Sequence, residues 1–141
     1  MKSPYTEVLA AIRRAPMEMA ARFFGKRREG RVSVSELLSL YLIDLLDGPT
    51  LKEYAEIMGI SQPNATYKIN VMAEKGYVEK RLSEEDRRQT LLYVTAKAQQ
   101  LFVDSGSENL EQELCGRFTE EQLSTAQQVF ETIVKFYSGK K

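Results

Sequence analysis

A short polar stretch places an aspartate two residues before an arginine. Residues 83–89 read Ser-Glu-Glu-Asp-Arg-Arg-Gln, a run that is too long for a two-residue turn and too polar to be buried, so it is expected to project as a loop. The carboxylate of Asp86 can hold an arginine fork in one orientation through charge-assisted hydrogen bonds. A fixed guanidinium at Arg88 suits a narrow, negative minor groove. The alternative is an ordinary charged hairpin tip, whose surface ion pairs contribute little.

A second set of hydrogen-bonding side chains lies on a predicted helix that ends at Lys75. Ala65, Ile69 and Met72 form the apolar stripe of this helix. Off the stripe lie polar side chains that could reach base edges and phosphates: Gln62, Asn64, Thr66, Tyr67, Lys68 and Asn70. An asparagine or glutamine amide can pair bidentately with adenine, and a good pair discriminates by about 1 to 3 kcal/mol. A solvated surface helix would show the same pattern.

Local signals predict the elements that position these side chains. Thr50, with Glu53 three residues later, is an N-cap candidate for a helix from Leu51, and Gly59 allows that helix to stop abruptly. Ser61 can cap the next helix, in which an early proline is harmless. After Gly76, two runs rich in strand formers, 77–82 and 90–95, flank the polar loop. Together these segments predict a winged helix-turn-helix.

The same residues resemble the multiple-antibiotic-resistance-regulator (MarR) family. The resemblance is carried by the Gly-Ile-Ser turn, the Glu-Lys-Gly-Tyr-Val run at 74–78, the Asp-Arg-Arg loop at 86–88 and the Leu-Tyr-Val-Thr run at 92–95. It extends over essentially the whole chain. It implies a mainly α fold with a small β-wing, in which N- and C-terminal helices form a dimerisation region. Within a single domain, 1–141, residues 34–97 would be the DNA-binding winged helix-turn-helix, and 4–28 and 96–138 the dimerisation helices.

The implied function is a transcriptional regulator, a repressor, that binds palindromic double-stranded DNA as a homodimer. In this reading Arg88 enters the minor groove and Asp86 orients it. The remaining implied contacts are Ser61, Gln62, Pro63, Asn64, Thr66, Tyr67, Lys68, Asn70, Arg81 and Arg87. Two departures matter: Ala98 stands where the family usually has glycine, and Tyr67 stands where many members carry arginine. Contacts at Tyr67 therefore cannot be copied from relatives.

The flanking segments read as helices. Ser3-Pro4 begins one, and Pro16 predicts a kink or break near Ala15, before a basic run between Gly25 and Gly30. Ser33 and Glu36 form a capping pair for a helix over 34–46 that is apolar on nearly every side, so we expect it to be the central buried element. Residues 49–51 are expected to supply a short third strand.

After the wing, Thr95 is expected to cap one long helix that is weakened by two glycines, at 106 and 116. Thr119 and Gln122 are expected to cap a last helix whose apolar residues repeat at spacings of 3, 4, 3 and 4. We expect the first and last helices of two chains to interlock through Tyr5, Leu9, Ile12, Leu123, Phe130, Ile133 and Tyr137. The alternative is that this stripe packs onto its own core. Two modules related by a two-fold axis would read a palindrome.

Composition sets further bounds. Basic and acidic residues balance at 20 each, but residues 13–31 carry seven basic against two acidic residues, and residues 104–121 carry six acidic residues against one basic residue. The N-terminal apolar run is too short for a secretory signal, and no stretch approaches a membrane span of roughly 20 residues, so we expect a cytoplasmic protein with no membrane partner. A possible small aromatic or amphipathic effector is assigned to Met17, Phe23, Phe24 and Tyr41.

Other function classes find little support. The chain has no histidine, one cysteine and no phosphate-loop glycine cluster, so we expect no enzyme activity, no metal and no cofactor. A redox sensor would need a reactive Cys115, which we expect instead to be a half-buried structural thiol. A winged helix that binds protein instead of DNA is the remaining alternative.

Overall fold

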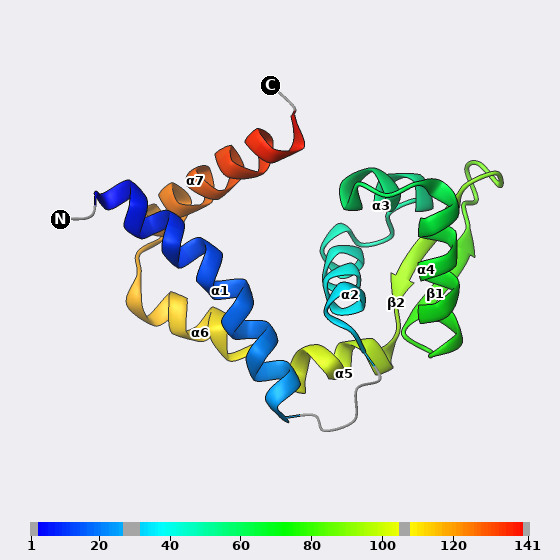
Figure 1. Ribbon diagram of the computed structural model, residues 1–141, viewed down its shortest axis with the longest axis horizontal. Coiled ribbons are helices and arrows are strands. Elements are labelled where there is room, and N and C mark those ends of the chain that lie inside the picture. Colours follow the sequence, from blue (N-terminus) through cyan, green and yellow to red (C-terminus); the bar gives the residue numbers. More distant parts are fainter. Residues whose placement is uncertain (1–2, 27–31, 105–107, 140–141) are drawn as a thin grey trace. The chain divides into compact units, whose positions relative to one another are not determined.

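A computed structural model of the chain describes residues 3–26, 32–104 and 108–139, with side chains at 3–22, 32–103 and 109–139. The chain divides into two units, 1–105 and 106–141. The first unit holds helices α1 (Pro4–Lys26), α2 (Val34–Leu46), α3 (Leu51–Met58), α4 (Gln62–Glu74) and α5 (Ala96–Asp104), with strands β1 (Val78–Leu82) and β2 (Thr90–Val94) (Figure 1). The second holds α6 (Glu108–Arg117) and α7 (Glu120–Ser138).

Side-chain caps start the helices where the sequence predicts. Ser33 and Glu36 form a reciprocal capping box at α2, and Thr119 and Gln122 form another at α7. The hydroxyl of Thr50 accepts a hydrogen bond from the amide of Glu53 at the start of α3. The hydroxyl of Thr95 accepts one from the amide of Ala98 at 3.3 Å, as expected for a cap of α5. These bonds satisfy amide donors that have no partner within a first helical turn.

The core of the first unit lies where α2, α3, α4 and α5 meet the sheet. Its most deeply buried large side chains are Tyr54, Leu40, Ile43, Ile69, Met72, Leu92 and Leu101. The phenol of Tyr54 reaches the hydroxyl of Ser39 at 2.8 Å. Burial raises the pKa of Tyr54, because ionisation would place a charge among apolar side chains.

Helix α2 corrects one expectation. The sequence predicts that this helix, apolar on nearly every side, is the central buried element, but it is buried along one stripe only: Val34, Leu38 and Leu45 are 50%, 51% and 79% exposed. The described elements of the first unit pack against one face of α2 only, so the remaining apolar side chains stay open. A helix that is apolar on nearly every side is therefore not necessarily buried on every side within one chain.

The wing is an antiparallel hairpin in which Val78 pairs with Val94 and Leu82 with Thr90. Where a short third strand is predicted, at residues 49–51, the chain makes one isolated antiparallel β-bridge, between Thr50 and Leu91. Just before it, the chain leaves α2 through Asp47 and Gly48, which have φ of 45° and 90°. This left-handed turn brings the backbone of Gly48 against the ring of Tyr93 on β2.

Replacing Gly48 by alanine is expected to lower the free energy of unfolding by about 1 kcal/mol or more, because alanine resists positive φ. The new Cβ would also lie 2.6 Å from the phenol oxygen of Tyr93, so the ring would have to move. Urea unfolding measures the change. Gly116→Ala is the control, since a Cβ there meets nothing within 4 Å. Equal stability of the Gly48 variant and the wild-type chain would contradict this account.

Two helix predictions differ in detail from the structure. Of the kink or break predicted near Ala15, the break does not occur, because α1 continues through Pro16 to Lys26. One missing amide donor did not end a helix whose neighbouring residues are good helix formers. In place of one long helix after the wing, α5 ends at Asp104 and α6 begins at Glu108. Gly106, which was expected to weaken the long helix, and residues 27–31 of the basic run lie outside the described residues.

Candidate nucleic-acid interface

Helix α4 presents its polar side chains on the face opposite its buried stripe. Ala65, Ile69 and Met72 are at most 1% exposed and anchor the helix. The residues predicted to contact DNA that are exposed here are Gln62, Pro63, Asn64, Thr66, Tyr67 and Asn70. Tyr67 is 71% exposed, which is unusual for a side chain of its size. The position of this face follows from the core contacts, so it is held rigidly.

A tight turn sets the angle at which α4 leaves α3. Gly59 ends α3 with φ of 67°, and the amide of Ile60 donates to the carbonyl of Ala55. Ser61 then caps α4 by accepting from the amide of Asn64 at 3.3 Å.

The loop between the strands holds Arg88 in one orientation. Asp86 Oδ1 accepts from both Nε and the backbone amide of Arg88, each at 3.1 Å, and Oδ2 accepts from Nη2 at 3.4 Å. The Arg88 side chain is nevertheless 91% exposed. The guanidinium therefore projects from the tip while the carboxylate fixes its direction. The structure brings Asp86 and Arg88 together as the sequence predicted, and Arg87 beside them is exposed.

Arg88 lowers the pKa of the Asp86 carboxyl through hydrogen bonds from its side chain and backbone. A carboxyl whose folded-state pKa is depressed contributes its stabilisation above its ordinary pKa and loses it as the pH falls through the folded-state value. The arrangement is thus complete at neutral pH. The buried Ser83 closes the base of the loop, because its hydroxyl accepts from the amide of Asp86.

The basic residues Lys80 and Arg81 lie on opposite faces of β1. Lys80 donates from Nζ to Oδ1 of Asn70 on α4 at 2.6 Å. Because successive strand residues face opposite sides, Arg81 lies on the other face. There it is paired with Glu79 at 3.1 Å and lies over the ring of Tyr93, 4.4 Å from the centroid. The pair with Glu79 raises the pKa of Arg81 and lowers that of Glu79. Arg81 is therefore not placed with the polar face of α4.

Lys80 was missed by the reading of the sequence. The signal was present, because Val78 is a buried strand residue and a period of two places Lys80 on the same side as Val78. This strand runs back along α4, so the loop lies toward the N-terminal end of that helix (Figure 1). The wing tip and the start of α4 thus share one end of the module.

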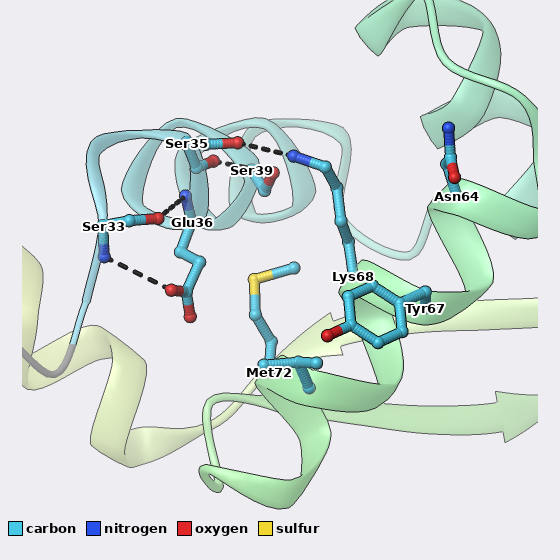
Figure 2. Close-up of a pocket in the computed structure, with 9 residues that line it drawn as sticks. Ser33, Ser35, Glu36, Ser39, Asn64, Tyr67, Lys68 and Met72 are labelled. Carbon is cyan, nitrogen blue, oxygen red and sulfur yellow. Dashed lines mark hydrogen bonds between the residues drawn. The ribbon is translucent and has the colours of Figure 1, made fainter.

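Lys68 occupies a different place from the other α4 candidates. It is half-buried, and its Nζ donates to the hydroxyl of Ser35 at 2.7 Å. Figure 2 shows this side chain reaching from α4 to α2 beside a cavity of about 270 Å³. The cavity is lined by Ser33, Ser35, Glu36, Ser39, Asn64, Tyr67, Lys68, Val71 and Met72. Lys75 pairs with Glu36 at 2.9 Å and ties the other end of α4 to α2.

The sequence of the helix-turn-helix and wing matches a known protein family. Residues 32–89, from the start of α2 to the end of the wing loop, match the sequence model of the MarR family. This module belongs to the MarR family. No curated protein matches the chain.

Solved structures show the same fold as the MarR module and its flanking helices. A mutant of MepR from S. aureus matches with a TM-score of 0.71 at 16% identity, covering 97% of this chain and 99% of that one. FabT from Streptococcus pneumoniae, in complex with DNA, matches with a TM-score of 0.67 at 18% identity, covering 96% of each chain. A mutant of MarR from E. coli, complexed with operator DNA, matches with a TM-score of 0.56 at 15% identity, covering 92% and 93%. The predicted mainly α fold with a small wing is confirmed.

The residues expected to hold an effector do not line the cavity of the MarR module. Met17 on α1 is 70% exposed, and Tyr41 stacks on Phe102 with ring centroids 4.5 Å apart. The side chains of Phe23 and Phe24 lie outside the described residues. The effector assignment stays a prediction.

Cys115 and Ala98 are two further residues whose surroundings the structure shows. Cys115 on α6 is exposed, so the expectation of a half-buried thiol was wrong. Exposure without an activating neighbour does not make a thiol reactive. Ala98, at the position where the family usually has glycine, is fully buried in α5. A methyl group is accommodated there because the backbone is helical.

Proposed function

We propose that the protein is a DNA-binding transcriptional regulator whose helix α4 enters the major groove while the wing enters the adjacent minor groove. The observation that carries this proposal is the exposed Arg88 guanidinium held by Asp86. An exposed ion pair such as Asp86–Arg88 contributes little to stability, but it can orient the arginine so that the guanidinium enters a narrow minor groove. Two of the matched structures, of FabT and MarR, are described as complexes with DNA, which supports the same partner here.

We further propose that the protein acts as a homodimer on palindromic sites. None of the residues of the last helix, α7, is buried within the single chain. Its apolar side chains Phe130, Val134 and Tyr137 are 51%, 65% and 76% exposed. Leu123 and Ile133 are half-buried. On α1, Tyr5 is 82% and Leu9 41% exposed, and Ile12 is half-buried. So much open apolar surface favours a partner over solvent. A two-fold pair would place α4 helices about 34–36 Å apart.

Repression and release complete the proposal. A dimer on DNA within a promoter would exclude polymerase, and a small aromatic or amphipathic molecule would release it by binding preferentially to an arrangement that does not fit DNA. Such a ligand shifts the population only as far as its affinities for the two arrangements differ. Both the dimer helices and the cavity between α2 and α4 are places where such a molecule could alter the spacing or position of α4.

The salt dependence of binding tests the proposal directly. The protein is titrated onto the duplex from upstream of its own gene at two or more salt concentrations, in gel-shift or anisotropy assays. The slope of log affinity against log salt is expected to be about −0.9 for each phosphate contact, so several contacts give a steep fall. A random duplex of equal length is the control. A winged helix that binds only protein would show no binding to either duplex, and this outcome would refute the proposal.

A further inference from the structure

The side chains of Asn70 on α4 and Lys80 on β1 meet at the junction of helix and wing. Their contact, Nζ to Oδ1, is 2.6 Å long, and both residues are exposed. A lysine ammonium has three donors and no acceptor, so the Asn70 atom it contacts must be the carbonyl oxygen. The amide orientation, which is otherwise ambiguous, is therefore determined by the chemistry of its partner.

The contact leaves donors for an outside ligand. Within the described residues, no hydrogen bond of the Asn70 Nδ2 is found, and Lys80 uses one of its three N–H groups on Oδ1. Asn70 shares the outer face of α4 with Thr66 and Tyr67, at three- and four-residue spacing. The pair thus lies beside the side chains proposed to face the groove and offers N–H groups from both of its members.

We propose that Asn70 and Lys80 form one donor-only element that reads guanine, with Lys80 as the residue that positions the Asn70 amide. This inference rests on the proposed DNA-binding function. Guanine presents two acceptors, O6 and N7, in the major groove, whereas adenine presents one acceptor and one donor. A free asparagine amide matches adenine, because it has one donor and one acceptor to offer. Lys80 occupies that acceptor and so changes the base that the amide suits.

Selection from a pool of duplexes tests the inference. The wild-type protein and Lys80→Met are each used to select from duplexes with about 20 random base pairs, enough for two half-sites. We expect the wild-type protein to enrich guanine at one symmetry-related position in each half-site. In Lys80→Met the freed amide is expected to shift that position to adenine. Affinities for two duplexes that differ only there should change their ratio by roughly tenfold.

Three variants separate positioning from charge and from folding. Lys52→Met removes the same charge from an exposed residue of α3 and is expected to keep the guanine preference. Lys80→Arg keeps the donors and is expected to keep it too. Asn70→Asp keeps an acceptor for Lys80 but loses the outward donor, so it is expected to lose guanine and favour cytosine, whose N4 group donates. Circular dichroism confirms that each variant is folded.

The outcomes distinguish this inference from the function on which it rests. If Lys80→Met lowers affinity for all sequences equally and keeps the wild-type base preference, Lys80 is only a structural tie between α4 and β1, and the inference is wrong. If the wild-type protein enriches no sequence from the pool, the proposed function itself fails. A shift from guanine to adenine in Lys80→Met alone supports the inference.

Discussion

Replacing Phe130 by glutamate is expected to leave a monomer that binds operator DNA roughly 100-fold more weakly or worse. Phe130 lies on the apolar stripe of α7 and is 51% exposed within its chain. A carboxylate at this position would be buried without a partner in an interface between two such helices, at a cost of several kcal/mol. A monomer holds only one half-site and loses the gain of two to four orders of magnitude that a tethered second module supplies.

Sedimentation gives the oligomeric state of this variant, and anisotropy with a palindromic duplex gives its affinity. Gln128→Glu is the matched control, because it adds the same charge to an exposed position on the opposite face of α7. It is expected to remain a dimer and to bind DNA nearly as well as the wild-type protein. A dimeric Phe130→Glu variant with wild-type affinity would show that α7 does not hold two chains together.

Replacing Arg88 by alanine is expected to weaken operator binding by more than about 1 kcal/mol, which is roughly fivefold or more. The reason is that Arg88 is held by Asp86 before any DNA arrives, so little side-chain entropy is lost on binding. A preoriented guanidinium also reads the narrow, negative shape of an A·T-rich minor groove. The loss should therefore be larger for the operator than for random DNA.

Arg87→Ala is the control for charge alone. Arg87 is the exposed neighbour of Arg88, and no bond comparable to the Asp86 contact holds it in the described part of the chain. Its removal is expected to lower affinity for all sequences to a similar, smaller extent and to flatten the salt slope. Asp86→Asn should fall between the two, since an amide orients the guanidinium less strongly than a carboxylate. Unchanged operator affinity in Arg88→Ala would contradict the wing assignment.

Much of the module was predictable because it depends on neighbours in the chain. The caps at Ser33, Thr50 and Ser61 each act over three residues, and the positive φ of Gly59 belongs to a single turn. The hold of Asp86 on Arg88 spans two residues. Contacts of this range are determined by residue type and spacing, so they are visible in a sequence.

The sequence by itself thus determined the winged helix-turn-helix, the polar face of α4 and the oriented arginine at the wing tip. Only the tertiary structure decided which of the candidates are available. Lys68 is drawn to Ser35, 33 residues away, and Asn70 is met by Lys80 across ten residues. The physical reason is that partners brought together by packing, and the faces that packing leaves open on α2 and α7, depend on how the elements meet and not on any local spacing.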